Sequence, residues 1–151
     1  MLVAAFGCKS LTEVRFPVSP SALDYVQFVT HVPDTSGRAH TVRIELRGSG
    51  YLEYRAGTSE RVRTGFWESP SAVSWEDLDE RHVALSPADT LRILQRVVDA
   101  GLFDRGGSRD ISVTRRPLFV QASIGREKQI RVTDEEVFYN IFRDLLRKFQ
   151  F

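Results

Sequence analysis

Two alternating stretches place the strongest constraint on the fold of this chain. Residues 41–47 and 51–55 both alternate apolar with polar or charged side chains, and a Gly-Ser-Gly turn joins them. A period of two is typical of a β-strand with one buried face, and the short turn indicates a hairpin. If Arg47 pairs with Tyr51, the apolar side chains of both strands fall on one face. The sequence therefore predicts an antiparallel sheet with one apolar and one charged face.

Further strands are expected on both sides of this hairpin. Residues 23–32 are rich in β-branched and aromatic side chains, and we expect residues 61–67 to continue the meander. Residues 118–124 and 129–132 are expected to pair across a short turn. The acidic stretch 69–82 is expected to be irregular, because it is too long for a hairpin loop.

Two helices are predicted from capping residues and apolar spacing. The first follows Ser86, with Pro87 at its first position, and ends at Gly101. The second spans about residues 134–149 and starts with a capping box formed by Thr133–Glu136. Both helices are apolar on one side only. The sequence thus predicts an α+β fold: a mainly antiparallel sheet with two amphipathic helices packed on one face, in the order β-β-β-β-α-β-β-α.

The single cysteine follows an uncharged N-terminal segment. Ala5-Phe6-Gly7-Cys8 resembles the lipobox of bacterial lipoproteins, which implies that Cys8 carries the lipid and attaches the protein to a membrane. The resemblance also implies a signal-peptide remnant over residues 1–7, a flexible tether over residues 8–22 and a place in the bacterial cell envelope. From the length of the chain we expect one domain, over residues 23–151.

Two readings of the N-terminal segment remain open. A signal peptide needs a longer apolar core after a basic region, so one reading is that the chain starts within a longer signal peptide. The other is that Met1 is the true start. Residues 1–7 are then an apolar arm or a first strand, and the protein is cytoplasmic.

The body of the chain resembles a group of uncharacterised secreted bacterial domains. The shared features are the hairpin Val42–Tyr54 and a helix preceded by Leu85-Ser-Pro-Ala-Asp, and the similarity spans about residues 42–149. The group has no established activity, so the resemblance implies architecture and no chemistry.

The charged face of the predicted sheet is a candidate binding surface. Basic side chains interleaved with aromatic ones are typical of proteins that bind single-stranded nucleic acid. The chain has 21 Lys and Arg against 20 Asp and Glu, however, and Glu45 and Glu53 among the arginines would repel phosphate. We therefore expect a solvated face with cross-strand ion pairs and no nucleic-acid partner. The candidate residues are Arg43, Arg47, Tyr51, Arg55, Arg61, Arg63 and Trp67.

Motifs for catalysis are not found in the sequence, so we expect no catalytic residues and no cofactor. The P-loop, HExxH, CxxC and GxSxG patterns do not occur. His31 and His40 flank a turn that contains Asp34, and these three side chains are an alternative zinc site.

Three hypotheses follow from the sequence. The first is a lipid-anchored envelope domain with a binding or structural role and an unidentified protein or cell-wall partner. The second is a small metal-dependent enzyme that uses His31, His40 and Asp34. The third is a soluble module that binds nucleic acid or another partner through the Arg-rich face.

Overall fold

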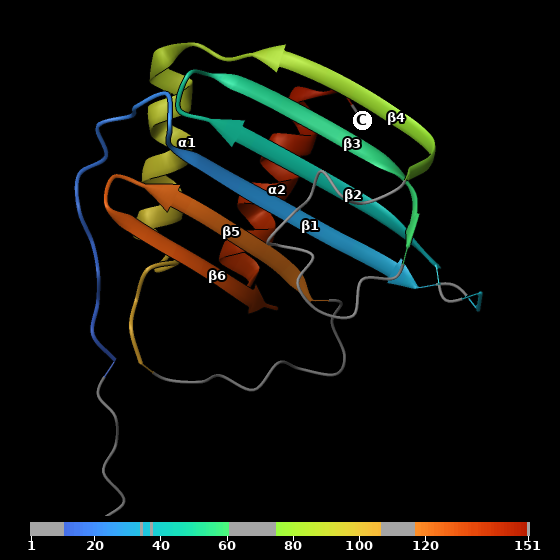
Figure 1. Ribbon diagram of the computed structural model, residues 1–151. Coiled ribbons are helices and arrows are strands. Elements are labelled where there is room, and N and C mark those ends of the chain that lie inside the picture. Colours follow the sequence, from blue (N-terminus) through green and yellow to red (C-terminus); the bar gives the residue numbers. More distant parts are fainter. Residues whose placement is uncertain (1–10, 34, 37, 61–74, 107–116, 151) are drawn as a thin grey trace, which may run out of the picture.

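Six antiparallel strands form one sheet, and two helices cover one of its faces (Figure 1). The computed structural model describes residues 11–33, 35–36, 38–60, 75–106 and 117–150. The strands lie in the order β4-β3-β2-β1-β5-β6. The elements are β1 (Tyr25–Pro33), β2 (Arg38–Arg47), β3 (Tyr51–Glu60), β4 (Trp75–Ala84), α1 (Pro87–Asp99), β5 (Leu118–Ile124), β6 (Glu127–Thr133) and α2 (Glu136–Lys148). The predicted α+β fold and its element order are confirmed.

The hairpin β2–β3 has the predicted register. Leu46 pairs with Leu52, and Ile44 pairs with Tyr54. These four side chains are buried in the core between the sheet and the helices. We call the opposite side of the sheet, which faces away from the helices, the outer face (Figure 1).

The fourth strand differs from the prediction. The structure forms β4 from residues 75–84, so that most of the strand lies in the stretch 69–82 that was expected to be irregular, whereas residues 61–67 lie outside the described residues. β4 is an edge strand and most of its side chains are exposed, so its sequence carries no apolar alternation.

A β-bulge interrupts the pairing of β4 with β3. Ala56 pairs with Asp79 and Thr58 with Glu76, so Gly57 lies opposite two residues. Asp77 has a positive φ of 51°, as in bulges whose first residue is left-handed. A Cβ at Gly57 would lie 2.7 Å from the carbonyl oxygen of Glu76, so a glycine is needed there.

The helix ends match the prediction in one case and not in the other. The Ser86 hydroxyl accepts a hydrogen bond from the Asp89 N–H at 3.1 Å, as expected for the N-cap of α1. Thr133 does not cap α2: its hydroxyl accepts from the Glu135 N–H, and the helix begins at Glu136. The predicted capping box is therefore wrong, because the chain makes a local turn before the helix starts.

The segment before β1 is attached to the body. Thr12 and Arg105 exchange two backbone hydrogen bonds, of 2.7 and 2.9 Å. The Gln95 side chain accepts from the Val18 N–H at 2.8 Å and donates to the Phe16 carbonyl at 3.1 Å, and Val18 is buried in the core. Residues 12–18 thus differ from the flexible tether that the sequence led us to expect over residues 8–22.

Candidate functional site

The outer face carries a ladder of six charged side chains on β2, β3 and β4. Arg43 lies directly opposite Arg55, and Glu45 lies opposite Glu53. Like charges in directly opposed positions destabilise a strand pair. The side chains avoid this by pairing along each strand and diagonally between strands. We call this set the charged ladder; its members are Arg47, Glu45, Arg43, Glu53, Arg55 and Glu80.

Arg43 is the centre of the charged ladder. Its guanidinium bonds to Glu45, and it donates to Glu53 at 2.9 Å. Arg43 is 7% exposed and Glu45 is 8% exposed, and charges so deeply buried are costly unless they are paired. The solvated face expected from the sequence is therefore buried at its centre.

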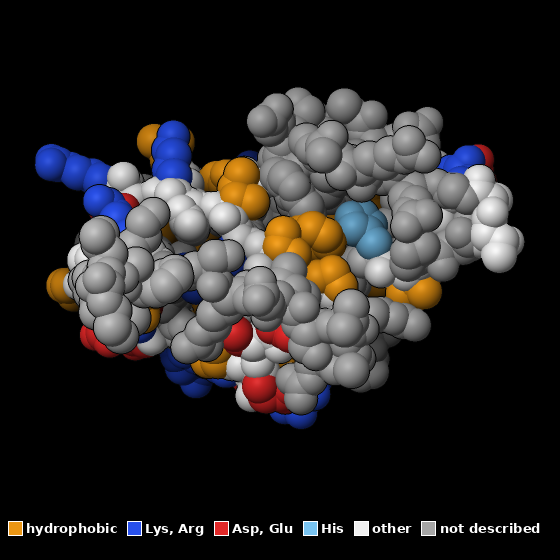
Figure 2. Space-filling view, turned by 90° about the horizontal axis from the view of Figure 1, so that it is seen from below, with side chains coloured by type: hydrophobic (Ala, Val, Ile, Leu, Met, Phe, Trp, Pro, Cys, Tyr) orange, Lys and Arg blue, Asp and Glu red, His pale blue; other side chains and the backbone are white. Residues whose placement is uncertain are grey.

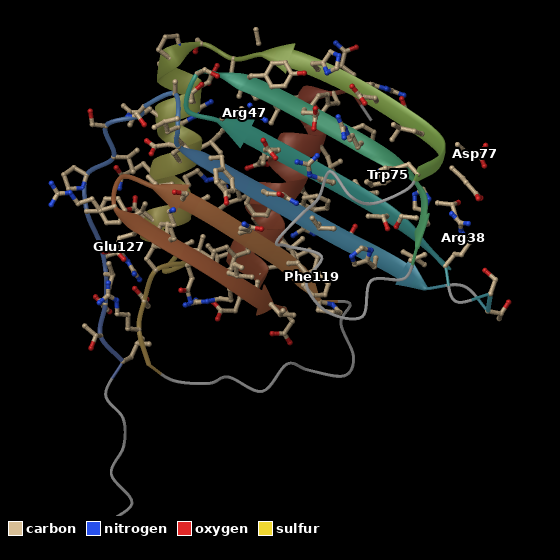
Figure 3. The ribbon with its side chains drawn as sticks, viewed as in Figure 1. Arg38, Arg47, Trp75, Asp77, Phe119 and Glu127 are labelled. Carbon is tan, nitrogen blue, oxygen red and sulfur yellow. The ribbon has the colours of Figure 1, made fainter. Side chains whose placement is uncertain are left out.

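The outer part of the ladder is open to solvent. Arg47, at the turn end of β2 (Figure 3), lies 2.9 Å from Glu45, and its side chain is 58% exposed. Arg55 lies 3.3 Å from both Glu53 and Glu80. Because three arginines face three glutamates, the ladder has no net charge. The described arginines of the predicted binding surface are thus bonded to carboxylates; Arg61, Arg63 and Trp67 lie outside the described residues.

Tyr51 belongs to a second group at the edge of this face. Its ring stacks on His82 with the centroids 5.6 Å apart, and its hydroxyl lies 2.8 Å from His82 Nδ1. The potential ligand atoms of Glu53, Glu80 and His82 lie within 4.8 Å of one another, which is a possible geometry for a metal ion. Arg55 contacts both of these carboxylates, so a cation there would compete with its guanidinium.

The sequence did not reveal this group, because residues 69–82 were expected to be irregular. In the structure His82 lies directly opposite Glu53 on β4. Without the pairing of β4 with β3, the sequence could not show that His82 lies beside Glu53.

The two histidines of the alternative zinc site are not brought together. His31 pairs with Thr41 and His40 pairs with Val32, so the two histidines point to opposite faces of the sheet. Asp34 lies outside the described residues. His31 Nδ1 is 2.8 Å from the Thr41 hydroxyl, and the ring packs edge-on against Phe119. Burial lowers the pKa of the His31 imidazole.

A buried carboxylate attaches the N-terminal segment. Asp104 accepts a hydrogen bond from the Val14 N–H at 2.9 Å and forms an ion pair with Arg15. Burial acts to raise the pKa of Asp104, but the hydrogen bonds from Arg15 and Val14 and the charge of Arg15 outweigh it and lower the pKa. Cys8, the candidate lipid-attachment residue, lies outside the described residues.

The comparisons with known proteins give no family. No protein-family model matches the sequence, and no curated protein matches it. Within the described residues, neither helix has the length and apolar character required to cross a membrane.

Proposed function

We propose that this protein is a lipid-anchored domain of the bacterial cell envelope with a binding or structural role, attached to the membrane through acylated Cys8. The observation that carries the proposal is the lipobox-like order Ala5-Phe6-Gly7-Cys8. In bacterial lipoproteins a cysteine in this context becomes the acylated first residue. Two or more acyl chains provide stable attachment, at about 0.8 kcal/mol for each buried CH₂.

Because the N-terminal segment is bonded to the body of the domain, only a short stretch of chain would separate a lipid on Cys8 from the fold. Thr12 is bonded to the body only four residues after Cys8. An extended chain covers at most 3.6 Å per residue, so four residues reach about 14 Å. A lipid on Cys8 would hold this side of the domain close to the bilayer instead of at the end of a long tether.

The experiment is metabolic labelling of the protein expressed from its own genomic region in a bacterial host. We expect the wild type to incorporate labelled palmitate and to sediment with membranes. Cys8→Ser should lose both properties, and the matched variant Ser10→Ala should keep them. Intact mass should show the acyl groups on the wild type. Equal labelling of wild type and Cys8→Ser, or no labelling of either, would contradict the proposal.

A further inference from the structure

The two edges of the sheet differ in their protection against pairing with another strand. β4 is interrupted by the bulge at Asp77, and five of its ten residues are charged. Bulges and charges are the usual means by which an edge strand is kept from adding a further strand. Among the described residues β6 forms the other edge, and it pairs with β5 over seven consecutive residues without a bulge. Three of its seven residues are charged as well, so the bulge is what distinguishes the two edges. Of the two edges, β6 is the one suited to pairing.

The side chains of β6 divide between a fixed side and an exposed side. On the side of the helices, Glu127 is ion-paired with Arg105 at 3.0 Å, and Arg131 donates to the Asp104 carbonyl at 3.2 Å. On the outer face, Ile130 is 45% exposed and Val132 is 38% exposed. Figure 2, which looks toward the β6 side of the sheet, shows a small group of hydrophobic side chains near the centre of this view, next to a histidine and between residues that are not described.

We propose that β6 is the interface through which two copies of this chain pair antiparallel, joining their two sheets into one. β6 spans seven residues with Ile130 at its centre. Pairing along the full length of both strands therefore places Ile130 on the twofold axis, against the partner's Ile130. Ile130 is then covered by its own copy, and Val132 lies diagonally across from the partner's Ile130, as the twofold symmetry of an isologous interface requires.

The charges on and beside β6 are self-complementary in this register. Arg126 falls opposite the partner's Asp134, just beyond the ends of the paired strands. Glu127 falls diagonally across from the partner's Arg131, in addition to the bonds that these two side chains make to Arg105 and to the Asp104 carbonyl in their own chain, and symmetry repeats both pairs. Lys128 falls opposite the partner's Val132 and is kept away from its own copy. Opposite charges in facing or diagonal positions stabilise antiparallel strands and fix their register. An unrelated strand would need to supply this same pattern, so a second copy is the occupant that the chain itself specifies.

The first test is the mass of the protein in solution. The full chain with Cys8→Ser, which prevents coupling through the native thiol, should sediment as a dimer that dissociates on dilution. Ile130→Lys places two like charges on the axis and should weaken dimerisation at least tenfold. Leu78→Lys on β4 is the matched control, since Leu78 is 42% exposed on the other edge, and it should leave the dimer intact. A monomer at all concentrations, or a dimer that survives Ile130→Lys, would overturn the proposal.

The second test does not depend on how Ile130→Lys folds. Ile130→Cys in the Cys8→Ser background should form an intermolecular disulfide under mild oxidation. Directly opposed residues of antiparallel strands have Cα atoms about 4.5–5.5 Å apart, which suits a disulfide. Leu78→Cys should cross-link much more slowly. Equal rates for the two variants would exclude the β6 interface.

Discussion

Replacing Arg43 by methionine tests whether the charged ladder stabilises the fold through paired buried charges. Methionine keeps much of the length of arginine but removes the guanidinium, leaving Glu45 and Glu53 directly opposite each other without the cation between them. Removing one partner of a buried ion pair typically costs about 3–5 kcal/mol, because the other charge stays buried. For a chain of this size that corresponds to a fall in Tm of roughly 6–20 °C.

The matched control is Arg47→Met. Arg47 contacts the same glutamate, Glu45, but its side chain is largely exposed, so its removal should cost less than about 1 kcal/mol. Glu45→Gln added to Arg43→Met should recover at least about 1 kcal/mol, because it removes the like-charge opposition. Urea denaturation at pH 7 measures all three free energies of unfolding. The reasoning fails if Arg43→Met costs no more than Arg47→Met, or if Glu45→Gln gives no recovery.

Three further predictions concern the turn, the half-buried His31 and the N-terminal segment. Gly48→Ala should destabilise the protein by more than about 2 kcal/mol in urea denaturation, because the new Cβ would lie 1.8 Å from the Ser21 carbonyl oxygen; a near-neutral effect would refute this. Since the pKa of His31 is lowered in the folded protein, its contribution to stability should be complete above about pH 6.5 and decrease as the pH falls. Tm measured at pH 7.5 and 5.5 should therefore change less in His31→Gln than in the wild type, and equal changes would contradict this origin. Asp104→Asn should detach residues 12–18 and so increase their proteolysis and hydrogen exchange. Because the pKa of Asp104 is lowered, the wild type should lose this protection only below about pH 4, where the carboxylate becomes protonated. Unchanged protection in the variant would show that Asp104 does not hold the segment.

The hairpin could be predicted to its register because two independent signals agree there. Alternation decides which side chains of β2 and β3 share a face, and the short turn decides which residues lie opposite each other. The helices were predictable for a similar reason, since apolar spacing and the Ser86 cap point to the same start of α1.

β4 could not be predicted because its stability depends on a neighbour. It contributes few buried side chains, and its bulge at Asp77 breaks the period of two. The strand is held by backbone hydrogen bonds to β3, and these do not depend on a side-chain pattern that could be recognised in the sequence of β4. The contacts of residues 12–18 were hidden for a related reason, because their partners Gln95 and Asp104 are far away in the sequence and leave no local pattern.

Burial of the charged ladder shows the limit of reasoning from alternation alone. Alternation separates polar from apolar side chains, but it does not say whether the polar face meets solvent. Arg43 and Glu45 are ion-paired with each other and buried, so the centre of the outer face has no net charge to offer to a phosphate. The exposed apolar side chains Ile130 and Val132 lie on β6, at the other end of the sheet.

The two proposals about this protein meet at the start of β6. Thr12 is bonded to Arg105, and Arg105 is ion-paired with Glu127, the first residue of β6. An anchor on Cys8 would therefore hold the β6 edge near the membrane, where all copies of the chain move in two dimensions. Confinement of this kind raises the effective concentration of one copy around another without any new contact. A β6 dimer that dissociates at micromolar concentration in solution should consequently remain paired on vesicles that carry the acylated chain, whereas acylated Ile130→Lys should stay monomeric there.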